Sequence, residues 1–175
     1  MATKNTITTA FLFADGSKVI FELPRNAHLT KNFQVKELAN NKAKEEVKLV
    51  LTVNSLVFLS RCQMLRDRRG VMNTTSYYRT ESFNASKDCQ GSKNSLHLEP
   101  RIRAMDFLLP YDKQPEWIDD WYEISKTCGF IGGFNRYPNR VHIDDYEDFY
   151  GYNKFVIRDY TKMKNGKPTI TYRKY

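Results

Sequence analysis

The stretch Ser95-Leu96-His97-Leu98-Glu99-Pro100-Arg101-Ile102-Arg103-Ala104-Met105-Asp106 sets a histidine near a carboxylate, in a chain with only 3 histidines. A second pair of the same kind lies downstream, at His142-Ile143-Asp144. Zinc binds imidazole nitrogens and carboxylate oxygens, and two histidines with one carboxylate form a ligand set that hydrolytic zinc sites use. We therefore predict that His97, Asp106 and His142 hold one divalent metal ion, with Zn2+ as the first candidate.

Residues 132–139 (Gly-Gly-Phe-Asn-Arg-Tyr-Pro-Asn) predict how the second pair is presented. They indicate a glycine-rich loop and a turn, followed by a short strand. Alternate side chains of a strand point to the same face. If Val141 and Ile143 face the core, His142 and Asp144 share the other face. One of these two residues could then bind metal while the other orients that ligand or transfers protons. A lone His–Asp pair is also typical of a plain surface or core hydrogen bond, so residue types alone leave both interpretations open.

Composition sets limits on the class of protein. The 175 residues suggest a single domain, and the 41% of hydrophobic residues are enough for a real core. The net charge of +8 favours an anionic partner, such as a cell wall, a nucleic acid or lipid headgroups. No nucleic-acid recognition motif appears, so we expect no specific nucleic-acid partner.

The 3 cysteines are an odd number without regular spacing and do not suggest a disulfide framework. Cys62 and Cys128 have apolar neighbours and are predicted to be buried thiols, whereas Cys89 lies in a polar loop. The start, Met1 to Thr6, lacks the basic region and apolar run of a signal peptide. No stretch approaches the ~20 apolar residues of a membrane helix. We therefore expect a protein that is made in a cytoplasm without a signal peptide.

Local patterns predict the main elements. A hairpin is expected from strands at 7–13 and 18–22 around the turn Ala14-Asp15-Gly16-Ser17, and helices are expected at 54–69 and 114–128. Strands are expected at 71–78, 106–110, 149–160 and 169–175, the last two joined by a turn at Asn165-Gly166, and 82–94 is expected to be a polar loop. The tryptophans of the second helix, Trp117 and Trp121, are assigned to the core. His28 is assigned to the surface.

A set of short motifs occurs in a fixed order. They are Asn32 to Leu38, Leu65-Arg66-Asp67, Thr75-Ser76-Tyr77-Tyr78-Arg79-Thr80, Ser95-x-His97, Ala104-x-Asp106, and Gly132-Gly133 continuing to Val141-His142-x-Asp144. In this order, across roughly residues 30 to 150, the chain resembles the zinc D-alanyl-D-alanine carboxypeptidase-like murein peptidases. That family shares a fold with the Hedgehog signalling domain.

The resemblance implies an α+β fold of the Hedgehog/DD-peptidase type, with a central antiparallel sheet and flanking helices. Residues 1–175 would form one domain: an N-terminal β-hairpin extension (1–29), the family core (30–160) and a C-terminal strand (161–175). The implied activity is that of a zinc metallopeptidase, a carboxypeptidase or endopeptidase that cleaves the stem peptide of bacterial peptidoglycan. Without a visible export signal, a phage endolysin or a virion-borne enzyme for cell wall degradation is the expected type.

The resemblance also implies roles for single residues. His97, Asp106 and His142 would be the metal ligands, and Arg79 would hold a substrate carboxylate or carbonyl oxygen and help to stabilise the oxyanion. A guanidinium suits that role because its planar fork donates two hydrogen bonds. Ser95 would bind the peptide or support His97, and a turn cap is an equally open interpretation.

The sequence departs from the family pattern at two places. Eight residues, Leu98 to Met105, separate the first histidine from the aspartate, more than is usual, and the extra pair is expected to bulge out at Glu99-Pro100-Arg101. Asn139 stands where many members carry the acidic general base. Asp144 is then the predicted base, with Glu99 second. If Asp144 cannot reach the reacting water, the alternative is a non-catalytic cell-wall-binding or virion protein that keeps the fold.

Overall fold

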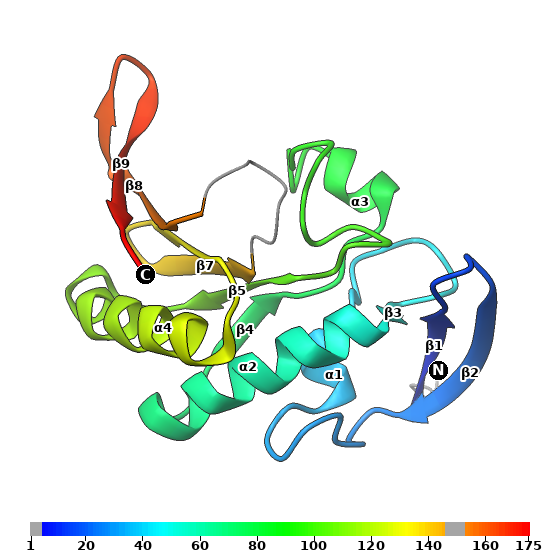
Figure 1. Cartoon of the computed structure of the whole chain (residues 1–175). Coiled ribbons are helices and arrows are strands. Elements are labelled where there is room, and N and C mark those ends of the chain that lie inside the picture. Colours follow the sequence, from blue (N-terminus) through cyan, green and yellow to red (C-terminus); the bar gives the residue numbers. More distant parts are fainter. Residues whose placement is uncertain (1–4, 146–152) are drawn as a thin grey trace. The chain divides into compact units, whose positions relative to one another are not determined.

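The structure, a computed structural model, describes residues 5–145 and 153–175 (Figure 1). Its elements are β1 (Thr6–Leu12), β2 (Lys18–Pro24), α1 (Val35–Leu38), β3 (Leu49–Leu51), α2 (Val53–Arg69), β4 (Asn73–Ser76), α3 (Glu81–Ala85), β5 (Ala104–Leu108), η1 (Tyr111–Lys113), α4 (Gln114–Cys128), β6 (Gly132–Arg136), β7 (Arg140–Asp145), β8 (Phe155–Lys164) and β9 (Lys167–Arg173). This mixture of helices and strands confirms the α+β class.

The chain groups into two compact units, Met1–Gln63 with Ser76–Arg103 and Met64–Thr75 with Ala104–Tyr175. The two units interleave along the sequence, and α2 contributes residues to both. The single-domain organisation, with its divisions at 1–29, 30–160 and 161–175, stays a prediction.

The first unit begins with the predicted hairpin, which is confirmed. β1 and β2 pair antiparallel from Thr6 opposite Pro24 to Leu12 opposite Lys18. The turn is closed by Asp15, whose carboxylate accepts the backbone N–H of Ser17 at 2.9 Å. The other edge of β1 pairs in parallel with β3, whose residues are all buried. The hairpin is therefore part of a sheet and not a detached flap.

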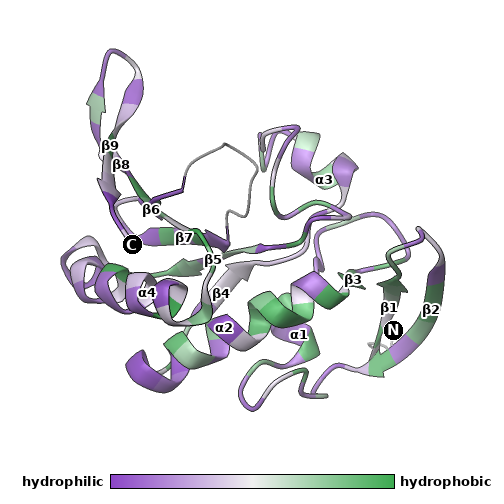
Figure 2. Cartoon of the chain, viewed as in Figure 1, coloured by the Kyte–Doolittle hydropathy of each residue, from purple (hydrophilic) through white to green (hydrophobic). Residues whose placement is uncertain are grey.

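The predicted helix at 54–69 is confirmed as α2. Its start is stabilised by Thr52 and Ser55, because each side-chain oxygen accepts the backbone N–H of the other residue, at 3.0 and 2.7 Å. Phe58 and Cys62 have no exposed surface, which confirms the buried thiol at Cys62. Figure 2 shows the polar C-terminal end of the helix in purple, where basic residues complement the helix dipole.

The second unit contains a sheet with the strand order β4-β5-β7-β6-β8-β9 among the described residues. β7 is antiparallel to both of its neighbours, but β6 and β8 run parallel. The prediction of an antiparallel central sheet is therefore wrong, because the sheet is mixed. Both edges of β7 are already occupied by β5 and β6, so β8 adds to the free edge of β6.

One face of this sheet is apolar and is covered by α4 (Figure 1). Met105, Ile143 and Phe134 stand opposite one another on β5, β7 and β6, and all three are fully buried. On α4, Trp117 and Trp121 pack into the same core; the Trp117 ring lies 5.2 Å from that of Phe107. The assignment of the tryptophans to the core is confirmed.

The helix α4 has the predicted bounds, Gln114–Cys128. Pro115 occupies its first turn, and Gly129 ends it in the left-handed conformation at φ +68°. Cys128, in contrast, is exposed, so the prediction of a buried thiol there is wrong. Cys128 has the helical spacing of Trp117, Trp121 and Ile124, but it lies on the last turn of the helix, and its sulfur lies 3.7 Å from that of Met64.

Residues Gly132 and Gly133 form the start of strand β6, so the predicted glycine-rich loop is wrong. A Cβ on Gly132 would lie 3.0 Å from the Phe155 ring. A Cβ on Gly133 would lie 2.8 Å from Cγ of Asp144 and closer still to its Oδ1. Glycine is needed here because neighbouring side chains approach the backbone closely, not because the chain turns.

Smaller differences occur elsewhere. The expected polar loop at 82–94 starts with the short helix α3, whose first N–H groups are capped by Thr80; the Thr80 hydroxyl accepts the N–H of Phe83 at 3.2 Å. The C-terminal hairpin is confirmed by the pairing of β8 with β9 around Asn165-Gly166. Residues 149–152 of the predicted strand lie outside the described residues.

Gly133→Ala is expected to destabilise the fold by about 1–3 kcal/mol, because the added methyl group must push the Asp144 carboxylate aside. The measurement is urea unfolding in the presence of chelator. The same substitution in an Asp144→Ala background removes the clashing group and should cost clearly less. Equal costs in both backgrounds would show that the contact does not explain the glycine.

Candidate metal centre

The register of β5 and β7 brings the second histidine to the first aspartate. Asp106 stands directly opposite His142 in this antiparallel pair, so their side chains emerge on the same face of the sheet. His142 Nδ1 lies 2.7 Å from Asp106 Oδ1. The predicted alternation is confirmed, since Val141 and Ile143 on the other face are fully buried in the core.

Asp144 lies on the same face, next to His142. Its Oδ2 is 3.1 Å from His142 Nε2, and the side chain is almost completely buried. Its second oxygen, Oδ1, is buried and has no hydrogen-bond partner among the residues that the structure describes. Ala104 and Gly133 stand opposite Asp144 on the two neighbouring strands. Their small size leaves room for this carboxylate within the sheet surface.

The two carboxylates decide the charge of the histidine. Burial alone would lower the pKa of His142, but the hydrogen bonds and negative charges of Asp106 and Asp144 outweigh it and raise the pKa to about 9. The ring is thus an imidazolium at neutral pH, with a proton on each nitrogen and a carboxylate facing each proton. One positive ring between two negative groups leaves this cluster of three side chains with one net negative charge.

His97 is held by its own segment. Its Nδ1 lies 2.7 Å from the backbone oxygen of Tyr77, so Nδ1–H donates to that carbonyl and Nε2 is the nitrogen suited to metal binding. The backbone N–H of His97 is accepted by Ser95 Oγ at 3.3 Å. Ser95 therefore supports the turn that carries His97, which was one of the roles considered for it. Glu99-Pro100-Arg101 lie in the following turns, where the bulge was expected.

His97, Asp106 and His142 each offer a ligand atom, and these atoms lie within 4.8 Å of one another. The group can therefore hold a metal ion. Its chemistry fits a divalent cation, because imidazole nitrogens and a carboxylate oxygen are ligands that such ions accept.

The structure also shows the surroundings of the other residues predicted for the site, Arg79, Glu99 and Asn139. The Arg79 backbone N–H donates to the His97 carbonyl at 3.0 Å, and Arg79 Nε donates to Ser76 Oγ at 2.8 Å. Its role in substrate binding stays a prediction. Glu99, the second candidate base, pairs with Lys18 at 2.8 Å. Asn139 is exposed in the turn between β6 and β7.

His28 is exposed on the surface, as predicted, and its Nε2 lies 3.1 Å from the side-chain nitrogen of Gln34.

Two features of the site were not predicted. Asn135 and Arg158 extend the row of Asp106 and His142 onto β6 and β8, and Arg158 donates to Asn135 Oδ1 at 3.3 Å. Strand register reveals this row, and no local sequence pattern encodes it. The second feature is the Tyr77 carbonyl that orients His97, a backbone group without any side-chain signal.

No protein-family model, no curated protein and no solved structure matches this chain. The likeness to murein peptidases therefore depends on the short motifs alone. Among the described residues, no helix combines the length and the apolar character that crossing a lipid bilayer requires.

The raised pKa of His142 predicts a pH-dependent stability for the metal-free protein. The ionised contact stabilises the fold by up to about 3 kcal/mol below pH ~6.5, and this contribution is lost as the pH rises through about 9. Urea unfolding with chelator, between pH 6 and 10, should show wild type losing its advantage over His142→Gln across that range. An advantage that grows with pH would contradict the assignment.

Proposed function

We propose that this chain is a zinc-dependent peptidase of the Hedgehog/DD-peptidase type that hydrolyses a peptide bond in the peptidoglycan stem peptide. One observation carries the proposal: three ligand atoms, from His97, Asp106 and His142, lie within 4.8 Å of one another. The ordered motifs and the net charge of +8, which suits an anionic cell wall, support the choice of substrate.

In this proposal His97, Asp106 and His142 hold the ion. Bound zinc supplies a Lewis acid that makes water a nucleophile near neutral pH. The chain prepares the ligands through neighbouring groups, because the Tyr77 carbonyl fixes the ring of His97. Burial of His97 and Asp106 excludes bulk water from this side of the centre.

Asp144 has two tasks in the proposal. Its Oδ2 faces His142 Nε2 and orients the ring. The Asp144 carboxylate is also the proposed base, which accepts a proton from the attacking water and returns it to the leaving amine. Glu99 is a poor base by comparison, because it already pairs with Lys18.

Arg79 and Ser95 complete the proposed site. The Arg79 backbone N–H donates to the His97 carbonyl at 3.0 Å, and the guanidinium of Arg79 is the group that we propose to bind a substrate carboxylate or carbonyl oxygen. Donors placed where negative charge develops lower the barrier to acyl transfer. Ser95 acts through His97, whose N–H it accepts.

A non-catalytic wall-binding or virion protein is the second candidate. It is favoured by Asn139, an exposed amide where an acid is expected, and by the contact of Asp144 with His142, which gives Asp144 a structural task. Both candidates predict a bound metal ion. Only turnover separates them.

Elemental analysis of the purified chain should find about one zinc per molecule, and His97→Ala or His142→Ala should lose both the metal and the release of stem-peptide fragments from purified murein. The third histidine provides the control, because His28→Ala changes an exposed residue and should keep both properties. Normal metal content in His97→Ala would remove His97 from the site. Murein that stays intact with fully loaded protein would favour the non-catalytic candidate.

Asp144→Asn is expected to keep the metal and to lower the turnover number by about 10²–10⁴, because an amide cannot accept the proton. The amide can still face His142, so folding should persist. Turnover is measured on murein at saturating zinc, with thermal unfolding as the check on folding. Full turnover would remove Asp144 from the proton transfer.

A further inference from the structure

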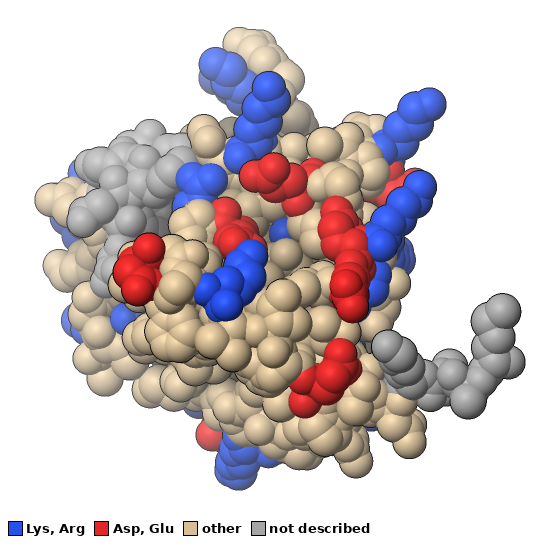
Figure 3. All heavy atoms as spheres, turned by 90° about the vertical axis from the view of Figure 1, so that its right-hand side faces the viewer, with Lys and Arg blue, Asp and Glu red and all other residues tan. Residues whose placement is uncertain are grey.

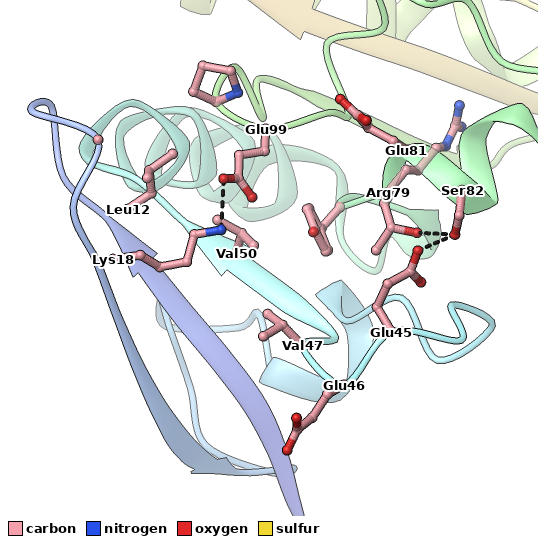
Figure 4. Close-up of a pocket in the computed structure, with 14 residues that line it drawn as sticks. Leu12, Lys18, Glu45, Glu46, Val47, Val50, Arg79, Glu81, Ser82 and Glu99 are labelled. Atoms are coloured by element: carbon pink, nitrogen blue, oxygen red, sulfur yellow. Dashed lines mark hydrogen bonds and ion pairs between the residues drawn. The ribbon is translucent and has the colours of Figure 1, made fainter.

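The first unit contains a hollow of about 890 Å³ (Figure 4). It is lined by Leu12, Gly16 and Lys18 from the N-terminal hairpin, Glu45, Glu46, Val47 and Val50 from the segment that leads into β3, Tyr78, Arg79, Thr80, Glu81 and Ser82, and the pair Glu99-Pro100. A hollow of this size accommodates a peptide side chain together with its neighbouring backbone.

The hollow shares its walls with the segment that holds His97. Arg79 and Glu99 both line it. The backbone of Arg79 is bonded to the carbonyl of His97 at 3.0 Å, and Glu99 follows His97 with one residue between them. A ligand in the hollow therefore lies beside the chain segment that carries a metal ligand.

The charge of the hollow is opposite to that of the chain. The lining contains four carboxylates, those of Glu45, Glu46, Glu81 and Glu99, and two cations, Lys18 and Arg79, in a protein of net charge +8. Figure 3 shows acidic side chains in red at several separate places on one face, with basic side chains in blue among them. Burial raises the pKa of Tyr78, and the carboxylates of Glu99, Glu45 and Glu81 raise it further, as expected beside several negative charges.

Two of these carboxylates are set up to accept hydrogen bonds. Glu45 receives the hydroxyl of Ser82 on one oxygen, which lowers the pKa of Glu45, and its other oxygen is buried without a partner among the described side chains. Glu99 already holds an ammonium group, that of Lys18, at 2.8 Å. Figure 4 shows these contacts on separate parts of the hollow.

Apolar side chains supply the rest of the surface. Leu12, Val47 and Val50 line the hollow along with the carboxylates. Methylene groups pack on such a surface while a charged end reaches the acids. A side chain with an aliphatic stem and an ammonium group at its end matches both the apolar and the acidic parts of this lining.

We propose that this hollow is the subsite for a substrate residue with an alkyl side chain that ends in a primary ammonium group. The inference rests on the proposed function, since it names a part of the peptide that the metal centre would cleave. Glu45 is the main acceptor, the apolar residues hold the methylene stem, and Lys18 competes with the ligand for Glu99.

The first test measures binding directly, without catalysis. Nα-acetyl-lysine methylamide and its Nε-acetylated form are titrated into the full chain, and nuclear magnetic resonance follows the Tyr78 signals. The amine should bind about tenfold more tightly than the acetylated form, because acetylation removes the charge and its hydrogen bonds to carboxylates. Equal binding of the two ligands would overturn the subsite.

Variants locate the site. Glu45→Gln should weaken binding of the amine about tenfold. The matched control is Glu123→Gln, an exposed glutamate of α4 in the second unit, which should bind like wild type. Equal affinities of the two variants would exclude Glu45 as the acceptor.

A variant that binds the amine more tightly than wild type tests the subsite without the risk that misfolding explains the result. Lys18→Met removes the internal ammonium from Glu99 and should tighten binding of the amine several-fold, a result that a damaged fold cannot produce. Unchanged or weaker binding in a variant with wild-type thermal unfolding would show that Lys18 does not compete.

The two proposals fail in different ways. Selective amine binding by a protein that leaves murein intact keeps the subsite and overturns the peptidase. Murein hydrolysis by a protein that binds both ligands equally keeps the peptidase and overturns the subsite.

Discussion

The contact between Asp106 and His142 depends on the pairing register of β5 and β7, and the register depends on the core. A slip of one residue would turn His142 and Asp144 to the apolar face and expose Ile143. The row of Met105, Ile143 and Phe134, covered by α4, opposes such a slip because every member is fully buried. Packing on one face of the sheet therefore positions the side chains of Asp106, His142 and Asp144 on the other face.

Charge places a second constraint on the same strands. Two buried carboxylates on one face are tolerated only when positive charge compensates them. In the protein alone, the compensating charge is the proton that makes His142 an imidazolium. A divalent ion would provide more charge than this proton, so an environment that raises the pKa of the histidine also favours a cation.

Local sequence patterns predict the ends of a helix and the faces of a strand, whereas most contacts between distant strands have no local pattern. Pro115 and Gly129 fixed the ends of α4, and the alternation around His142 indicated which side chains share a face. The pattern at Gly132 and Gly133 predicts a loop, and this prediction is wrong because glycine is required there by the approach of Phe155 and Asp144 from other strands. The antiparallel sheet was predicted without the parallel pairing of β6 with β8. Local sequence does not reveal this pairing, because the neighbours of a strand depend on which sheet edges the rest of the chain leaves open.

The segment from Tyr77 to Arg79 links the two proposals physically. The Tyr77 carbonyl fixes the ring of His97, and the Arg79 N–H donates to the His97 backbone carbonyl. Tyr78 and Arg79 also line the hollow. A side chain bound in the hollow would restrict this segment, and a metal ion on His97 would restrict it from its other side. Since binding energies are reciprocal, each ligand that orders the segment lowers the conformational entropy that the other must still lose.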